Sequence, residues 1–146
     1  MQAVVITSME QLSEVLQLRR EVFIEEQGIP EELEMDGKEK QSTHVGIFEE
    51  QQLIACGRLT PVNSEEAVLS RIAVSKPFRS KGLGILIIKQ LEKEAGKSGY
   101  RKLSLKPHTY LEKFYHSLGY EKVKDVEIVG EHPLILMEKK LHHSNS

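Results

Sequence analysis

The chain has 146 residues, a formal charge of −2 and one cysteine, with the apolar and charged fractions of an ordinary globular protein. This charge argues against bulk nucleic-acid binding, the lone Cys56 excludes an internal disulfide, and no apolar run suggests a signal peptide or a membrane span. We therefore expect one cytoplasmic domain over residues 1–141 with a loose tail over residues 142–146, and neither nucleic acid nor membrane as a partner.

Charge is unevenly distributed along the chain. Residues 21–50 hold ten acidic residues against two lysines, whereas residues 76–106 hold nine Lys or Arg residues against two acids. The basic segment suits a phosphorylated ligand, and the acidic segment suits a cationic one. Two solvated faces of opposite sign would explain the same distribution, so both interpretations stay open.

The first part of the chain predicts a strand, a long helix and a loop. A strand is expected over residues 3–6. Apolar residues at helical spacing predict a helix over residues 9–27, opened by a capping box of Ser8 and Gln11. The acidic stretch over residues 31–41 has few apolar residues, so we expect a loop that lies on the surface.

The middle of the chain predicts three strands. Residues 44–49 and 53–59 flank a short polar turn and are expected to form a hairpin. A third strand is expected over residues 67–74, after a loop. Cys56 lies inside the second strand, where a buried, reduced thiol is the default.

A glycine-rich turn joins the third strand to a helix over residues 85–95. Unpaired N–H groups at a helix start and the helix dipole both favour an anion. Glycine lacks the Cβ that would keep a phosphate from the backbone, and Arg79 and Lys81 add two cations. The turn fits neither GxxxxGK[ST] nor GxGxxG. We expect this turn to bind a phosphate, and a plain helix-capping turn is the alternative. The turn consists of Arg79, Ser80, Lys81, Gly82, Leu83 and Gly84.

The last part of the chain predicts a strand, a short helix and a β-hairpin. The strand is expected over residues 103–105, and a capping box of Thr109 and Glu112 opens the helix. Residues 121–129 and 134–139 then close the sheet as a hairpin. The order β-α-β-β-β-α-β-α-β-β predicts an α/β fold, with a mixed central sheet of about seven strands flanked by helices.

Two motifs resemble the GNAT N-acetyltransferase family. The RxxGxG pattern of the turn is similar to the acetyl-CoA pyrophosphate loop of the family, and the segment Phe114-Tyr115-x-x-x-Gly119-Tyr120 stands at the separation that the family uses. The element order matches too, so the resemblance covers nearly the whole chain. A narrower likeness to the small bacterial ElaA-like subgroup depends on Arg19-x-x-Val22-Phe23-x-x-Glu26-Gln27-x-x-Pro30, with His44 and Arg71 downstream.

The resemblance implies an acyltransferase that uses acetyl-CoA as co-substrate and no metal. It places the pantetheine arm along the backbone of Ile72, Ala73 and Val74, which would also polarise the thioester carbonyl. It places the pyrophosphate on the glycine-rich turn and a further cofactor contact on His108. Family members often carry Asn at the position of His108 and Ala at that of Leu111, so these two departures concern the fit of the cofactor.

Acetyl transfer from a thioester to an amine has three chemical needs. The amine must be neutral, the carbonyl oxygen needs a donor, and the departing thiolate must be protonated or stabilised. Reference pKa values of about 10 for tyrosine and about 8.5 for a thiol let a tyrosine protonate a desolvated thiolate. Tyr115 resembles the tyrosine that the family places near the cofactor sulfur, so we expect it to be the general acid. A core aromatic beside Phe114 is the alternative.

The residue that deprotonates the amine stays open. His44 has a reference pKa near neutrality, and Glu26 suits the role if burial raises its pKa. A structural role for both, with a chain of water molecules as base, is the alternative. Arginines in the acceptor pocket would favour a carboxylate on the acceptor, so an amino acid or similar zwitterion would suit both charge patterns. The residues expected in this pocket are Arg19, Phe23, Gln27 and Arg71.

We expect direct transfer, in a ternary complex, to the primary amine of a small molecule. A non-catalytic CoA-binding regulatory module and a protein or peptide N-acetyltransferase are the alternatives. Cys56 lies mid-strand without a nearby histidine in sequence, so no ping-pong route is expected. Cys56, His132, His142 and His143 have no known metal-ligand spacing. The resemblance also makes a homodimer, through the sheet edge or the C-terminal strands, a common arrangement.

Overall fold

The computed structural model describes residues 1–129 and 131–141, so the expected tail over residues 142–146 lies outside the described residues. In chain order the elements are β1 (Ala3–Val5), α1 (Met9–Arg19), the π-helical segment η1 (Arg20–Glu26), α2 (Glu31–Glu34), β2 (Thr43–Glu49), β3 (Gln52–Pro61), β4 (Glu66–Val74), the 3-10 turn η2 (Lys76–Phe78), α3 (Leu83–Lys97), β5 (Lys102–Leu105), the 3-10 turn η3 (Thr109–Leu111), α4 (Glu112–Ser117), β6 (Glu121–Val129) and β7 (His132–Lys140). The expected α/β fold with a mixed seven-stranded sheet is confirmed.

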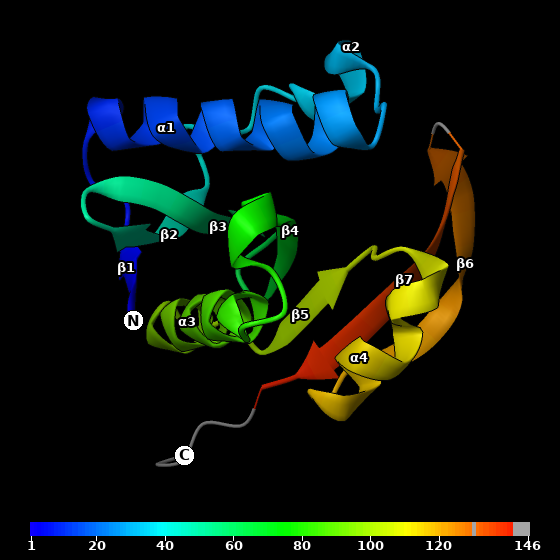
Figure 1. The fold of residues 1–146 in the computed structure, drawn as a ribbon. Helices are drawn as coiled ribbons and strands as arrows, with labels where there is room; N and C mark the ends of the chain where they lie inside the picture. The colour runs from blue at the N-terminus through cyan, green and yellow to red at the C-terminus, as the bar shows by residue number, and fades with distance from the viewer. Residues whose placement is uncertain (130, 142–146) are drawn as a thin grey trace.

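Two neighbouring strands of the sheet, β4 and β5, are paired over only part of their length. The strand order of the sheet is β1-β2-β3-β4-β5-β7-β6, and every neighbouring pair is antiparallel except β4 with β5. These two strands pair only over residues 66–68 of β4 and 102–104 of β5. Beyond these pairs they diverge, and Figure 1 shows β5 turning away from β4 toward β7. The rest of β4 therefore has one edge without a strand partner.

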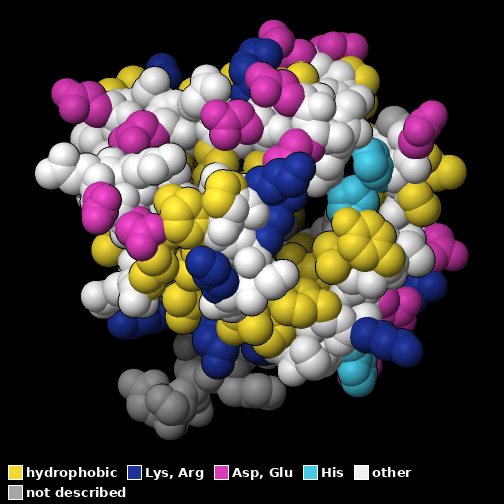
Figure 2. All heavy atoms as spheres, in the orientation of Figure 1, with side chains coloured by type: hydrophobic (Ala, Val, Ile, Leu, Met, Phe, Trp, Pro, Cys, Tyr) yellow, Lys and Arg dark blue, Asp and Glu magenta, His cyan; other side chains and the backbone are white. Residues whose placement is uncertain are grey.

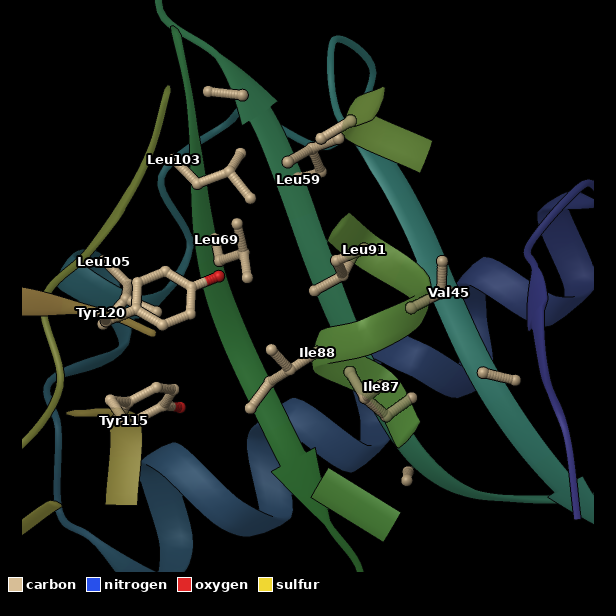
Figure 3. Packing of buried hydrophobic residues seen from close by; sticks show 14 of the residues in the cluster. Val45, Leu59, Leu69, Ile87, Ile88, Leu91, Leu103, Leu105, Tyr115 and Tyr120 are labelled. Atoms are coloured by element: carbon tan, nitrogen blue, oxygen red, sulfur yellow. The ribbon is translucent and has the colours of Figure 1, made fainter. Parts of the chain in front are cut away.

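The helix α3 covers one face of the sheet at close range. A Cβ at Gly57 would lie 2.5 Å from Ile87 Cγ2 and 2.9 Å from Leu91 Cδ1, so a glycine in β3 lets this helix approach. Figure 3 shows α3 directing these side chains toward the strands that carry Val45 and Leu59. Each such aliphatic side chain contributes about 1.5–3 kcal/mol when it is fully buried.

The helix α1 covers the opposite face. Its buried residues Val15 and Leu18 pack with Cys56 of β3, which is adjacent to Gly57 in sequence and therefore points the other way. The expected long helix is present, but from residue 20 onward it continues as the π-helical segment η1. None of the described helices has both the length and the apolar character that crossing a membrane requires.

Both expected capping boxes differ from the structure. Ser8 Oγ accepts a hydrogen bond from Gln11 N at 3.1 Å, but the Gln11 side chain accepts from Thr7 N and not from Ser8 N. The capping box of Thr109 and Glu112 is wrong, because α4 begins at Glu112 without a side-chain cap. The Thr109 hydroxyl instead donates to Pro133 O at 3.1 Å.

The expected surface loop over residues 31–41 is confirmed only in part: most of these residues are exposed, and residues 35–41 form no helix or strand. Its first residues form α2, and the Glu34 side chain is only 2% exposed. The acidic composition of this segment predicts exposed side chains, but the buried arginines on α1 and β3 require carboxylate partners. Those partners hold the acidic segment against the sheet.

Candidate active site

The divergence of β4 and β5 opens a cavity of about 690 Å³. This volume lies within the range of small-molecule and cofactor sites. Figure 2 shows the hollow, with histidine side chains at one rim and Lys or Arg side chains at the opposite one. Its lining includes Phe23, Gln27, Leu33, Ser70, Arg71, Ile72, Leu105, His108, Tyr110, Leu111, Tyr115 and His132.

The cavity side of β4 carries a β-bulge. The β3–β4 register passes from Ser70 to Ala73, so Arg71 and Ile72 together face Gly57 of β3. Arg71 has a φ of 56°, a left-handed conformation that non-glycine residues rarely adopt. The edge over residues 69–74 is unpaired on the β5 side. Its backbone polar groups are available to an extended ligand that adds to the edge like a strand.

The glycine-rich turn leaves backbone donors free at the start of α3. Ser80 and Gly82 have φ values of 65° and 79°, and α3 begins at Leu83 without a side-chain cap. Space is open around Gly82 and Gly84, because a Cβ at either position would meet nothing within 4 Å. A helix of this length with uncapped N–H groups favours an anion at this end.

The Arg79 side chain points away from the turn and pairs with Glu26 of η1. Two of its guanidinium nitrogens lie 2.8 Å and 2.9 Å from the Glu26 carboxylate oxygens, and its Nε donates to Val74 O at 2.9 Å. The hydrogen bonds from Arg79 lower the pKa of Glu26. Burial does not raise this pKa above its usual value, so the condition for Glu26 to act as base is not met.

His44 lies apart from the cavity. It is buried on β2, where it faces Arg58 of β3, and its Nε2 lies 3.0 Å from Glu39 O. Burial lowers the pKa of His44. Its Nδ1 is buried without a hydrogen-bond partner among the described residues. These features are those of a structural histidine that does not reach the β4–β5 opening.

Tyr115, the expected general acid, lies at the cavity wall. It is 6% exposed, and its burial raises the pKa to about 12. The hydroxyl therefore stays protonated at neutral pH, as a proton donor must. Figure 3 shows Tyr115 beside Tyr120, and the two rings meet edge-on with centroids 5.9 Å apart. The Tyr120 hydroxyl donates to Glu92 Oε2 at 2.8 Å, which anchors the supporting ring.

Arg19 lies in a buried ion-pair network rather than in the acceptor pocket. Its side chain is fully buried, and its Nε and Nη1 lie 2.8 Å from Glu34 Oε2 and 3.1 Å from Glu39 Oε2. Its Nη2 donates to Glu34 O at 3.0 Å. We call this network the arginine cluster, which consists of Arg19, Arg58 and Arg71 with Glu34, Asp36 and Glu39.

Arg71 lines the cavity together with Arg58, Glu34 and Asp36 of the same cluster. Its Nε lies 2.8 Å from Glu34 Oε2, and its Nη2 lies 3.3 Å from Asp36 Oδ2. Arg58 contacts both oxygens of Asp36, at 2.8 Å and 2.9 Å. Burial alone would raise the pKa of Asp36, but the hydrogen bonds from Arg58 and the nearby charges hold it well below the usual range.

Two histidines and a glutamine meet at another part of the cavity wall. His108 Nε2 lies 3.2 Å from Gln27 Oε1, and His132 Nε2 lies 2.7 Å from Gln27 O. Burial, and then the charge of His132, lowers the pKa of His108. We call this group, with the adjacent Tyr110, the histidine corner. The sequence pointed to no catalytic or acceptor-binding role for His132, because it lies 105 residues from its partner.

Metal binding has no support within residues 1–129 and 131–141, where no group of three or more His, Cys, Asp or Glu side chains is arranged to hold an ion. His142 and His143 lie outside the described residues. Cys56 is fully buried, and this burial raises the pKa of its thiol to about 12. Such a thiol remains protonated and is a poor nucleophile.

Known proteins resemble this chain over most of its length. Residues 6–141 match the family described as Acetyltransferase (GNAT) domain. The relative named Uncharacterized N-acetyltransferase YjcF, from Bacillus subtilis, is 34% identical over 129 residues, or 88% of this chain and 91% of that protein. The crystal structure of Escherichia coli ElaA is 28% identical, with a TM-score of 0.82 over 94% of this chain and 97% of that one. An acyl-CoA N-acyltransferase from Pseudomonas aeruginosa has a TM-score of 0.85 at 24% identity, over 95% and 99% of the two chains.

Proposed function

Because the chain belongs to the GNAT acetyltransferase family and is an acyltransferase, we propose that it transfers an acetyl group from acetyl-CoA to the primary amine of a small molecule. The observation that carries this proposal is the cavity at the β4–β5 opening. An unpaired strand edge and a buried tyrosine adjoin this opening, and the uncapped start of α3 follows the same strand in the chain. Each supplies one requirement of thioester aminolysis.

The cofactor would extend from the glycine-rich turn into the cavity. Its pyrophosphate would bind the free backbone N–H groups of residues 80–84, with Lys81 as the nearby cation. The pantetheine arm would pair with the open edge of Ile72, Ala73 and Val74. Arg79 would assist mainly by tying η1 to this edge, since its guanidinium is already bound to Glu26.

Tyr115 would act as the general acid. Its hydroxyl stays protonated at neutral pH, and among the described residues it has no hydrogen-bond partner, so it is free to donate to a thiolate. A backbone N–H of the bulge at Ile72 would donate to the carbonyl oxygen as negative charge develops there. The amine would attack the thioester directly, since Cys56 is buried and protonated.

The acceptor would enter beside η1 and the segment after β5. Phe23, Leu33 and Tyr110 give this side an apolar and aromatic lining. Arg71 reaches the same space, but Glu34 and Asp36 already hold its guanidinium. A carboxylate on the acceptor would compete with two protein carboxylates, so an amine without a carboxylate suits the pocket better than a zwitterion. The cytoplasmic location and the homodimer stay predictions.

The test is acetyl-CoA-dependent thiol release across polyamines, amino acids, amino sugars, aminoglycosides and short peptides. We expect release above the rate without acceptor for a small amine, and its loss in Tyr115→Phe. Tyr100→Phe removes a hydroxyl from a partly buried tyrosine that does not line the cavity, so it should keep the wild-type rate. Release only with peptides would favour a protein acetyltransferase. Tight binding of acetyl-CoA without any release would favour a binding module.

A further inference from the structure

The histidine corner fixes where the protons of its two imidazoles lie. His132 Nε2 is 2.7 Å from the main-chain oxygen of Gln27, and a carbonyl oxygen only accepts, so Nε2 carries the proton. His108 Nε2 is 3.2 Å from the side-chain oxygen of Gln27 and is a donor for the same reason. The neutral His108 therefore keeps its lone pair on Nδ1.

The ring of His108 is also held in orientation. It stacks on Tyr110 with centroids 5.3 Å apart and an interplanar angle of 28°, and it meets His132 edge-on at 4.8 Å. Among the described residues its Nδ1 has no hydrogen-bond partner, and this atom is not buried as Nδ1 of His44 is. His108 thus brings an unused acceptor atom, in a fixed position, to the wall of the cavity.

The charges around His108 favour its neutral form. The groups that face it are His132 from β7, Tyr110 from η3 and the neutral Gln27 from the end of η1. Burial first, and then the charge of His132, lowers the pKa of His108 from its usual value near neutrality. A lowered pKa leaves the ring unprotonated, and so able to accept a proton, at neutral pH.

We propose that His108 is the base that takes a proton from the ammonium form of the acceptor, with Gln27 and His132 as positioning residues. This inference rests on the proposed acetyl transfer. An atom that only accepts a hydrogen bond suits the N–H of an ammonium group. This proposal assigns His108 to the acceptor and not to the cofactor.

The protons balance as follows. His108 Nδ1 takes one proton from R–NH₃⁺, and the free amine forms a C–N bond with the thioester carbon. The C–S bond then breaks, and the thiolate takes the proton of Tyr115. The new amide nitrogen loses its second proton to the Tyr115 oxygen, which restores the hydroxyl. His108 releases its proton to solvent, so the products are the acetamide, CoA thiol and one H⁺.

The experiment combines imidazole NMR with pH-dependent kinetics on the full chain. Long-range ¹H–¹⁵N spectra of the wild type should show His108 protonated at Nε2, with a pKa below the ordinary value. With the best acceptor of the amine panel, His108→Asn should lower kcat about 100-fold and remove the acidic limb of the kcat/KM profile. Gln27→Glu places a charge opposite Nε2–H, so it should shift this limb to higher pH. His116→Asn makes the same change at an exposed position of α4 and should change neither quantity.

Three results would overturn the proposal. One is a proton on Nδ1 of neutral His108 in the NMR spectra. Another is an active His108→Asn enzyme that keeps the acidic limb of the kcat/KM profile. The third is a His108→Asn enzyme in which only the KM for acetyl-CoA rises, as expected of a residue that contacts the cofactor. A wild type that releases no thiol with any acceptor would refute the proposed function instead, and the two failures are therefore distinguishable.

Discussion

The arginine cluster and the glycine-rich turn differ in whether their polar groups have partners within the chain. In the cluster, three buried or half-buried arginines are bound to three carboxylates within the same chain. At the turn, the first N–H groups of α3 have no side-chain cap, and the space around Gly82 and Gly84 is open. Charge density alone therefore does not identify a ligand site. Groups without a partner are the ones that can bind.

Arg19→Ala in the arginine cluster should have the largest effect, a loss of unfolding free energy. Removing Arg19 leaves Glu34 with the half-buried Arg71 as its remaining ion partner, and the loss of one partner from a buried ion pair costs about 3–5 kcal/mol of unfolding free energy. Urea unfolding measures the change. The matched control is Arg20→Ala, because Arg20 and Glu31 form an exposed pair that should contribute about 0–1 kcal/mol. Equal losses in the two variants would mean that burial of the cluster adds nothing.

Tyr115→Phe should affect the reaction and leave the fold intact. Loss of a general acid lowers kcat by about 100-fold or more, whereas the phenyl ring keeps its contact with Tyr120. Thiol release gives kcat, and thermal unfolding gives stability. A variant with the wild-type kcat would assign the hydroxyl to packing and leave the thiolate to another donor.

Gly82→Ala, compared with Gly37→Ala, should separate the cost of backbone strain from the loss of anion binding. Gly82 and Gly37 have φ values of 79° and 73°, and a Cβ at either position would meet no atom within 4 Å. Alanine in the left-handed region costs about 1–2 kcal/mol at either site. Only the change at Gly82 should also weaken the binding of CoA, as measured by calorimetry. Equal CoA affinities for Gly82→Ala and Gly37→Ala would argue against the turn as phosphate site.

The smallest effect should be on acid stability. Asp36 has a pKa below its usual range, because its burial is outweighed by the hydrogen bonds from Arg58 and the nearby charges. A carboxyl group of this kind stabilises the fold above its unfolded pKa of about 3.9, and the contribution is lost as pH falls through the folded value. Asp36→Asn should therefore lose less unfolding free energy on acidification than the wild type does. A loss as large as that of the wild type would place the titrating group elsewhere.

Local signals in the sequence were sufficient for the fold and for the turn. The spacing of Leu83, Ile87 and Leu91 predicted the apolar face of α3, and the strand before Gly82 placed the turn at a helix start. These features depend on neighbours within a few residues, which periodicity and backbone preferences capture. The same is true of the order of strands and helices.

Long-range pairing explains what the sequence analysis missed. Glu34 looks like a surface residue by composition, yet its partners Arg19 and Arg71 lie 15 and 37 residues away. His108 and His132 likewise meet through Gln27, which is 81 and 105 residues distant from them. Hydrophobic patterns carry no information on such pairs. Arg19 was therefore expected in the acceptor pocket, whereas its side chain lies in the buried arginine cluster.

The short β4–β5 junction has a mechanical consequence for the choice of acyl donor. Three residue pairs join the half of the sheet that carries the glycine-rich turn to the half that carries Tyr115. The distance between the glycine-rich turn and Tyr115 therefore depends on the angle between the two halves of the sheet at this junction. Ala67 pairs with Leu103 at this junction, so a larger side chain at Ala67 would change the angle between the two halves of the sheet. Acyl-chain preference should therefore respond to residues that never touch the acyl group.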